Sequence, residues 1–173
     1  MSAADKRDAA ESTKAFRVVS CSDGLGIVEV GSVCLVVWRA AVSASRFQRQ
    51  RLALDNFVER YSGRAGLICV IEASAPPPEE RMRKASTDLL AKYGDRMRGV
   101  ACVIEASGIR GGITRSVLIG MSMLLSKQTA EVKFMATVAA AAAWMELKCN
   151  GASALSLLQA DKEIRLRLDS AAP

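Results

Sequence analysis

Two glutamates in identical surroundings are the residues best suited to chemistry in this chain. The hexapeptide Cys-Val-Ile-Glu-Ala-Ser occurs at residues 69–74 and again at residues 102–107, so that Glu72 and Glu105 each end an apolar run. Two carboxylates at one edge of a sheet can exchange protons with a substrate or hold a metal ion. Chemistry of either kind would require the two side chains to converge on one open site.

A structural role for the two glutamates is the alternative, and the sequence favours it. Duplication of a packing solution repeats a residue without any chemistry, and each carboxylate can instead cap the following helix or pair with an arginine. Three arginines lie near the ends of expected strands: Arg39, Arg81 and Arg110.

A glycine-rich segment after the second hexapeptide is another candidate. Residues 108–112 read Gly-Ile-Arg-Gly-Gly and precede a helical pattern. Arg110, Gly111 and Gly112 could therefore cradle an anion at a helix N-terminus. The spacing matches neither the P-loop nor the dinucleotide-binding fingerprint, so a turn that lets the helix pack closely is the favoured interpretation.

Ser74 and Ser107, the last residues of the two hexapeptides, are candidates for phosphorylation. They do not resemble catalytic nucleophiles, because the chain has no histidine to act as a base. No cysteine pair has the spacing of a zinc site. We therefore expect no metal and no cofactor. Simple capping or turn formation remains the favoured role of both serines.

The elements that position these residues follow from the repeat. Short aliphatic runs are typical of strands buried on both faces, and the stretch from residue 78 to residue 96 between the two copies is amphipathic. A strand–helix–strand unit makes the two strands parallel, and we expect them to be neighbours. Cys69 should then lie opposite Cys102, with Glu72 and Glu105 side by side at the carboxyl edge, where α/β sheets usually bind ligands.

The remaining pattern predicts an α/β fold with a four-fold β-α repeat, parallel core strands and an antiparallel N-terminal edge hairpin. Asp23-Gly24 indicates a hairpin turn between early strands. Expected strands are residues 16–21, 27–30, 33–38, 67–71, 100–104 and 132–135, and expected helices begin near residues 43, 78, 113, 137 and 153. The last helix has no clean apolar face, so it either packs on the domain, which is favoured, or binds a partner.

Composition narrows the classes of function. The formal net charge is +6, but the basic residues are dispersed and no aromatic residues interleave with them, so a nucleic-acid partner is not expected. The apolar stretches are too short to span a bilayer, and no membrane partner is expected. Five cysteines and a polar N-terminus without a signal-peptide pattern favour the cytoplasm. We expect a disordered tail at residues 1–14, a domain at 15–148, and a C-terminal helix and tail at 149–173.

The order of elements resembles the STAS domain of anti-sigma-factor antagonists, and in particular its diverged stand-alone bacterial relatives. The resemblance covers about residues 16–147 and rests on topology and soft motifs: Val36-Val37-Trp38-Arg39, Val70-Ile71-Glu72 before a proline-rich loop, Val132 to Met135, Ala136-Thr137 and Ala143-Trp144. It implies a STAS-like fold and a non-enzymatic switch that binds a kinase or another regulatory protein. Many such domains are phosphorylated on a loop serine or threonine.

The leading hypothesis is therefore a regulatory protein-interaction module of STAS type, with a phosphorylation switch at Ser74 or Ser107. A homo-oligomer is compatible with this hypothesis. The alternative is a small-ligand-binding protein or an enzyme that uses the Glu72/Glu105 edge and the 108–112 loop. A deep cleft with both carboxylates converging would favour the alternative, and a filled edge would favour the module.

Overall fold

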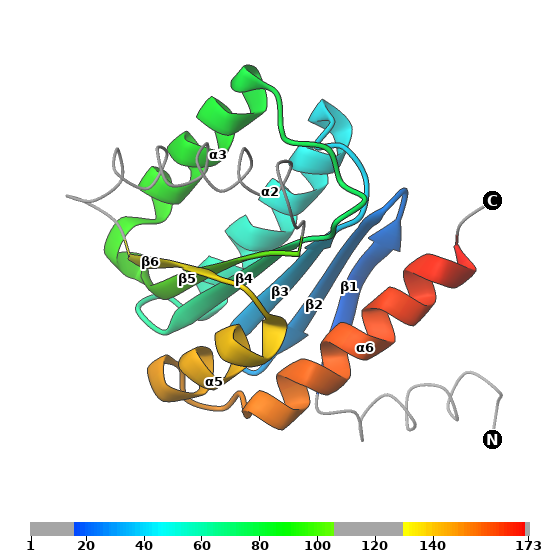
Figure 1. Ribbon diagram of the computed structural model, residues 1–173. Coiled ribbons are helices and arrows are strands. Elements are labelled where there is room, and N and C mark those ends of the chain that lie inside the picture. The colour runs from blue at the N-terminus through cyan, green and yellow to red at the C-terminus, as the bar shows by residue number, and fades with distance from the viewer. Residues whose placement is uncertain (1–15, 106–129, 172–173) are drawn as a thin grey trace, which may run out of the picture.

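A single mixed sheet organises the part of the chain that the structure describes. The computed structural model describes residues 16–105 and 130–171, and its six strands lie in the order β1-β2-β3-β4-β5-β6 (Figure 1). The strands are β1 (Arg17–Ser22), β2 (Leu25–Val30), β3 (Val33–Trp38), β4 (Ala65–Ile71), β5 (Met97–Ile104) and β6 (Glu131–Met135). β2 pairs antiparallel with both β1 and β3, and β3 to β6 pair in parallel. The expected α/β class and antiparallel N-terminal hairpin are confirmed.

The hairpin forms because two adjacent residues accept a left-handed backbone. Asp23 and Gly24 have φ angles of 51° and 70°. Two positive φ values in a two-residue loop match the twist of the flanking strands, and Asp-Gly is a favoured pair for such a turn. The turn is tighter than the sequence suggested, so β2 begins at Leu25 rather than at residue 27.

The two hexapeptides lie where the repeat predicted. β4 and β5 are parallel neighbours, and Cys69 lies opposite Cys102. Their pairing follows from the helix that connects them, since a parallel pair needs a crossover. The strand ends therefore place Glu72 and Glu105 at the same edge of the sheet.

Helices cover both faces of the sheet. In Figure 1, α2 (Ala44–Arg60) and α3 (Glu80–Tyr93) lie on one face, and α5 (Val138–Lys148) and α6 (Ala154–Ser170) lie on the other. A one-turn 3-10 helix, η1 (Gly94–Arg96), joins α3 to β5. Ser43, Thr137 and Ser153 cap α2, α5 and α6, because each side-chain oxygen accepts a backbone N–H of the first turn.

The C-terminal helix is part of the core. α6 buries one stripe against the sheet and α5, consisting of Leu157, Ala160, Ile164 and Leu168. Sequence inspection missed this stripe because Leu155, Leu158 and Leu166 on the same helix are exposed. The approach is close: a Cβ added at Gly26 would lie 2.4 Å from Cγ1 of Ile164. The expectation that α6 packs on the domain is confirmed.

No helix in residues 16–105 or 130–171 combines the length and the apolarity that crossing a bilayer requires.

Candidate functional site

The carboxyl ends of β4 and β5 bring the two repeated glutamates together. The backbone N–H of Glu72 donates to the Trp38 carbonyl at 2.9 Å, and that of Glu105 donates to the Ile71 carbonyl at 3.0 Å. These bonds continue the sheet ladder by one residue, so both side chains start from a fixed backbone. Glu72 and Glu105 therefore lie side by side at the strand ends, as the repeat predicted.

Arg39, which follows β3, holds the first carboxylate from one side. Its Nε and Nη2 donate to Oε2 and Oε1 of Glu72 at 2.7 and 3.1 Å. Its Nη1 donates to Oδ1 of Asp169 in α6 at 2.5 Å. Such two-pronged contacts are among the strongest side-chain hydrogen bonds, and this one ties the end of β3 to the end of β4 and to α6.

Arg165 of α6 joins the two glutamates. Its Nη1 and Nη2 donate to Oε2 and Oε1 of Glu105 at 3.0 and 2.7 Å, and Nη1 also donates to Oε1 of Glu72 at 3.2 Å. Its Nε reaches both carboxylate oxygens of Asp161 at 3.0 Å. One guanidinium group therefore donates hydrogen bonds to three carboxylates, two of them at strand ends and one on its own helix.

Burial and ion pairing act in opposite directions on the pKa values of this network. Burial alone would lower the pKa of Arg165, but its hydrogen bonds to Glu105 and Asp161 outweigh burial and raise it. Burial also raises the pKa of Asp161, against the opposing pull of Arg165. We call the set Arg39, Glu72, Glu105, Asp161, Arg165 and Asp169 the strand-end ion cluster.

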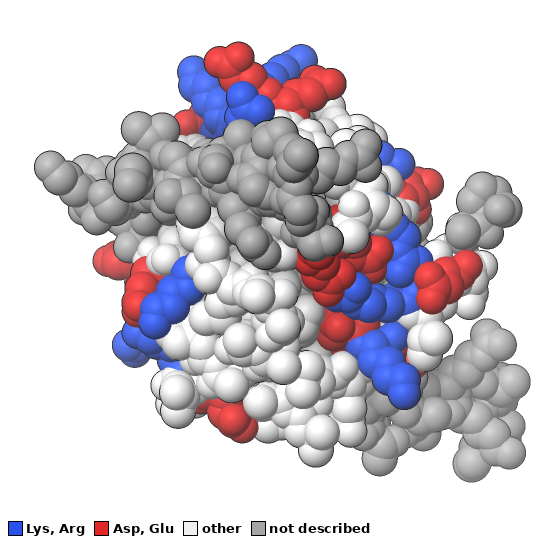
Figure 2. Space-filling view, viewed as in Figure 1, with Lys and Arg blue, Asp and Glu red and all other residues white. Residues whose placement is uncertain are grey.

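Figure 2 shows the same arrangement as a surface. Acidic and basic side chains alternate beside α6 at this edge, whereas the neighbouring surface over α5 is mostly uncharged. In the described residues no group of three or more His, Cys, Asp or Glu side chains is arranged to hold a metal ion. The oxygens of Glu72 and Glu105 instead accept hydrogen bonds from arginine.

The other sequence candidates have different outcomes. Of the three arginines near strand ends, Arg39 pairs with Glu72, as expected if the glutamates have a structural role. Arg81 lies exposed at the start of α3. Ser107, Arg110, Gly111 and Gly112 lie outside the described residues. Arg165 was not anticipated, since it is 93 residues from Glu72 in sequence and no local motif marks it.

Ser74 lies in the loop directly after Glu72 and is exposed. Its hydroxyl donates to the Arg39 carbonyl at 3.1 Å, and the N–H of Ala75 donates to the Glu72 carbonyl at 3.0 Å. The serine therefore lies against the backbone of a residue whose side chain belongs to the strand-end ion cluster.

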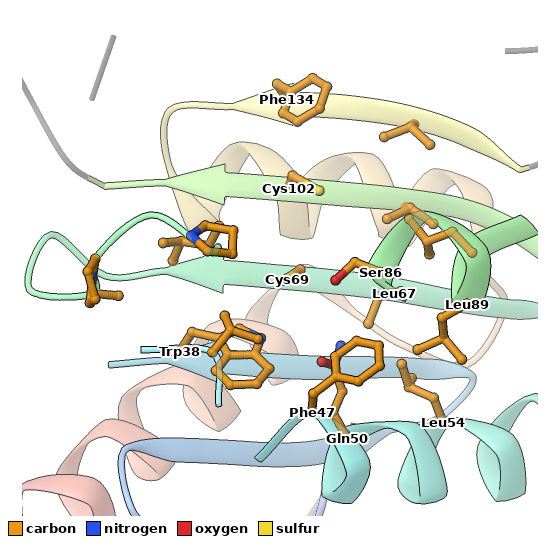
Figure 3. A pocket seen from close by; sticks show the side chains of 18 residues that line it. Trp38, Phe47, Gln50, Leu54, Leu67, Cys69, Ser86, Leu89, Cys102 and Phe134 are labelled. Atoms are coloured by element: carbon orange, nitrogen blue, oxygen red, sulfur yellow. The ribbon is translucent and has the colours of Figure 1, made fainter. Parts of the chain in front are cut away.

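A second feature, an apolar cavity, lies between the sheet and the helices α2 and α3 (Figure 3). Its volume is about 100 Å³, and it is partly open to solvent. Strands β3 to β6 form its floor, the two helices form its roof, and the proline-rich loop before α3 forms one wall. Sequence reasoning did not foresee it.

The cavity exists because small side chains stand in the middle of its floor. In the row of paired residues that crosses the sheet there, Cys69 and Cys102 lie between Val36 and Phe134. Burial raises the pKa of the Cys69 thiol to about 12, although a hydrogen bond with Trp38 pulls it down, and burial raises that of Cys102 as well. Both thiols are therefore neutral at physiological pH, and they act as small apolar groups.

Comparison of the chain with protein-family models, with curated proteins and with solved structures found no match.

Proposed function

We propose that this chain is a non-enzymatic regulatory protein-interaction module of STAS type. The order of strands supports the proposal. An antiparallel hairpin precedes a parallel series in which strands β3 to β6 lie in sequence order. The four-fold β-α repeat is part of the proposal, and the residues that follow β5 lie outside the described part of the chain. Its partner is a protein, either a kinase or another regulator.

The observation that carries the proposal is the filled strand-end edge. Glu72 and Glu105, the best candidates for acid/base work or metal binding, both accept hydrogen bonds from Arg165, and Glu72 accepts two more from Arg39. A substrate or metal at this edge would first have to displace two guanidinium groups. A protein surface needs no such displacement, because it can contact the exposed loops that surround the cluster.

A switch at Ser74 fits the same geometry. A phosphate on this hydroxyl would add about −1.5 to −2 charges at pH 7 beside the backbone of Arg39. The Arg39 side chain links Glu72 to Asp169 of α6, so a new anion that competes for it would loosen the loop from the C-terminal helix. Ser107 holds the equivalent place in the second hexapeptide and is the second proposed switch position.

Affinity capture with the full chain from its native cells tests the proposal. The bait is compared with Ser74→Ala and Ser74→Asp variants, and Ser62→Asp serves as a matched control because Ser62 is an exposed loop residue that follows α2. We expect one protein to be retained by the wild type and by Ser62→Asp, with its recovery changed at least fivefold by Ser74→Asp.

Mass spectrometry of the same eluates tests the alternative function. Reproducible recovery of a small metabolite without any protein partner would contradict the proposal and favour a ligand-binding protein or an enzyme at the Glu72/Glu105 edge. Equal recovery with all Ser74 variants would remove the switch and leave a constitutive scaffold.

A further inference from the structure

Gln50 is an unusual residue for the place it occupies. It lies on the inner face of α2 and lines the apolar cavity, with only 8% of its surface exposed. Within the described residues no side-chain hydrogen bond of its amide is found, and its amide atoms are not among the fully buried ones, so they face the partly open cavity. A reachable amide on a largely apolar wall is the kind of polar group that orients a ligand in a small-molecule site.

The other polar groups of the cavity are already partnered. The Ser86 hydroxyl donates to the Met82 carbonyl at 2.9 Å, and Trp38 forms its hydrogen bond with Cys69. Figure 3 shows Gln50 reaching from α2 over the floor formed by Trp38 and Cys69. The amide of Gln50 is thus the group that remains for a bound molecule, and it offers both a donor and an acceptor.

The dimensions and the walls define what can enter. The cavity of about 100 Å³ is somewhat smaller than the roughly 150 Å³ engineered cavity that binds benzene, and its partly open side gives room for a substituent. Aliphatic and aromatic side chains make up most of its lining. A small-molecule site has this composition when a few polar groups orient an otherwise apolar ligand.

We propose that the cavity between α2, α3 and the sheet binds a compact, mainly apolar molecule of one ring that carries a hydroxyl or a carboxamide, and that Gln50 hydrogen-bonds this polar group. The site shares no residue with the strand-end ion cluster, although its wall includes the proline-rich loop that follows Ser74. The proposal concerns a small effector or metabolite rather than a macromolecule.

Phenol and toluene form a matched pair of probes, because they have equal size and differ in a hydroxyl against a methyl. Each is titrated into the full chain while the side-chain signals of Gln50 and Trp38 are followed by NMR. The wild type is compared with Gln50→Met and with Gln48→Met, in which the same change is made at an exposed position of the same helix.

The decisive quantity is the ratio of the toluene dissociation constant to the phenol dissociation constant. Comparing this ratio between the wild type and a variant cancels the different cost of removing each probe from water. One neutral hydrogen bond contributes about 1 kcal/mol, so Gln50→Met should lower this ratio about fivefold, and Gln48→Met should leave it unchanged. Cys102→Leu, which fills the floor, should abolish binding of both probes.

Two results would overturn the proposal. An equal ratio in the wild type and in Gln50→Met would show that the amide does not select the ligand. Absence of any shift at Gln50 and Trp38 with either probe would show that neither molecule enters the cavity.

Discussion

Replacing Arg165 by methionine removes the group that joins the strand-end ion cluster to α6. Breaking a fully buried ion pair costs about 3–5 kcal/mol, whereas an exposed pair contributes about 0–1 kcal/mol. The Arg165 side chain is 23% exposed, and those of Glu105 and Asp161 are 30% and 14% exposed. Partial burial places the expected loss at about 2–3 kcal/mol. Because Arg39 still neutralises Glu72, the loss falls mainly on Glu105 and Asp161.

Urea unfolding of the full chain, followed by circular dichroism at pH 7, measures this loss. Arg167→Met is the control, since Arg167 is 42% exposed and pairs with Glu163 one turn away, a contact that contributes about 0.3–0.5 kcal/mol. The penalty of Arg165→Met should shrink as the pH falls towards 4, because burial raises the pKa of Asp161 and its protonated carboxyl group no longer needs the positive charge. A loss below about 1 kcal/mol, or no larger than that of the control, would refute the reasoning.

Three further predictions concern packing and pH. Gly26→Ala should destabilise the chain by about 2 kcal/mol in urea unfolding, because the added methyl would lie 2.4 Å from Ile164; an unchanged midpoint would contradict the close packing of α6. Cys102→Val should be neutral or stabilising by about 0.5–1 kcal/mol, because the larger side chain fills part of the cavity. Cys34→Val, at a fully packed position, should cost about 1 kcal/mol. Similar losses of stability in the two variants would argue against an empty cavity. Burial raises the pKa of Asp161 above its ordinary 3.8, so the folded chain binds this proton more tightly than the unfolded chain. The wild type should therefore gain stability relative to Asp161→Asn as the pH falls from 7 towards 3.8. A stability difference that stays constant or shrinks would contradict this account.

The sheet could be predicted from sequence because its information is local and repeated. Buried parallel strands read as short aliphatic runs, and the duplicated hexapeptide fixed the pairing of Cys69 with Cys102. Strand ends were less certain. β5 begins at Met97 rather than at residue 100, because Arg98 is exposed in an otherwise buried strand and interrupts the apolar run.

The candidate site could be predicted only in part, because its partners are far apart in sequence. The two glutamates were evident from the repeat, but Arg165 reaches them across 93 and 60 residues, and no spacing rule connects a C-terminal helix to strand ends. The docking face of α6 was hidden by exposed leucines on its outer side.

The cavity left one signal that sequence inspection could have used. Phe47, Gln50 and Leu54 lie at helical spacing on the inner face of α2, so a polar amide falls within an apolar stripe. That interruption marks Gln50 as a residue with a special environment. The hollow itself depends on the row that Cys69 and Cys102 share, which becomes visible only when the register of the sheet is known.

Site-specific photo-crosslinking tests most directly whether the loop at the strand ends contacts a protein partner. A benzophenone amino acid is placed at Ser74 of the full chain and, in a separate variant, at Asp95, which is exposed just before the amino end of β5. Both variants are irradiated in native cells. We predict a defined protein adduct from position 74 with at least fivefold higher yield than from position 95. Equal yields from the two positions, or no adduct from position 74, would contradict the proposed interaction module.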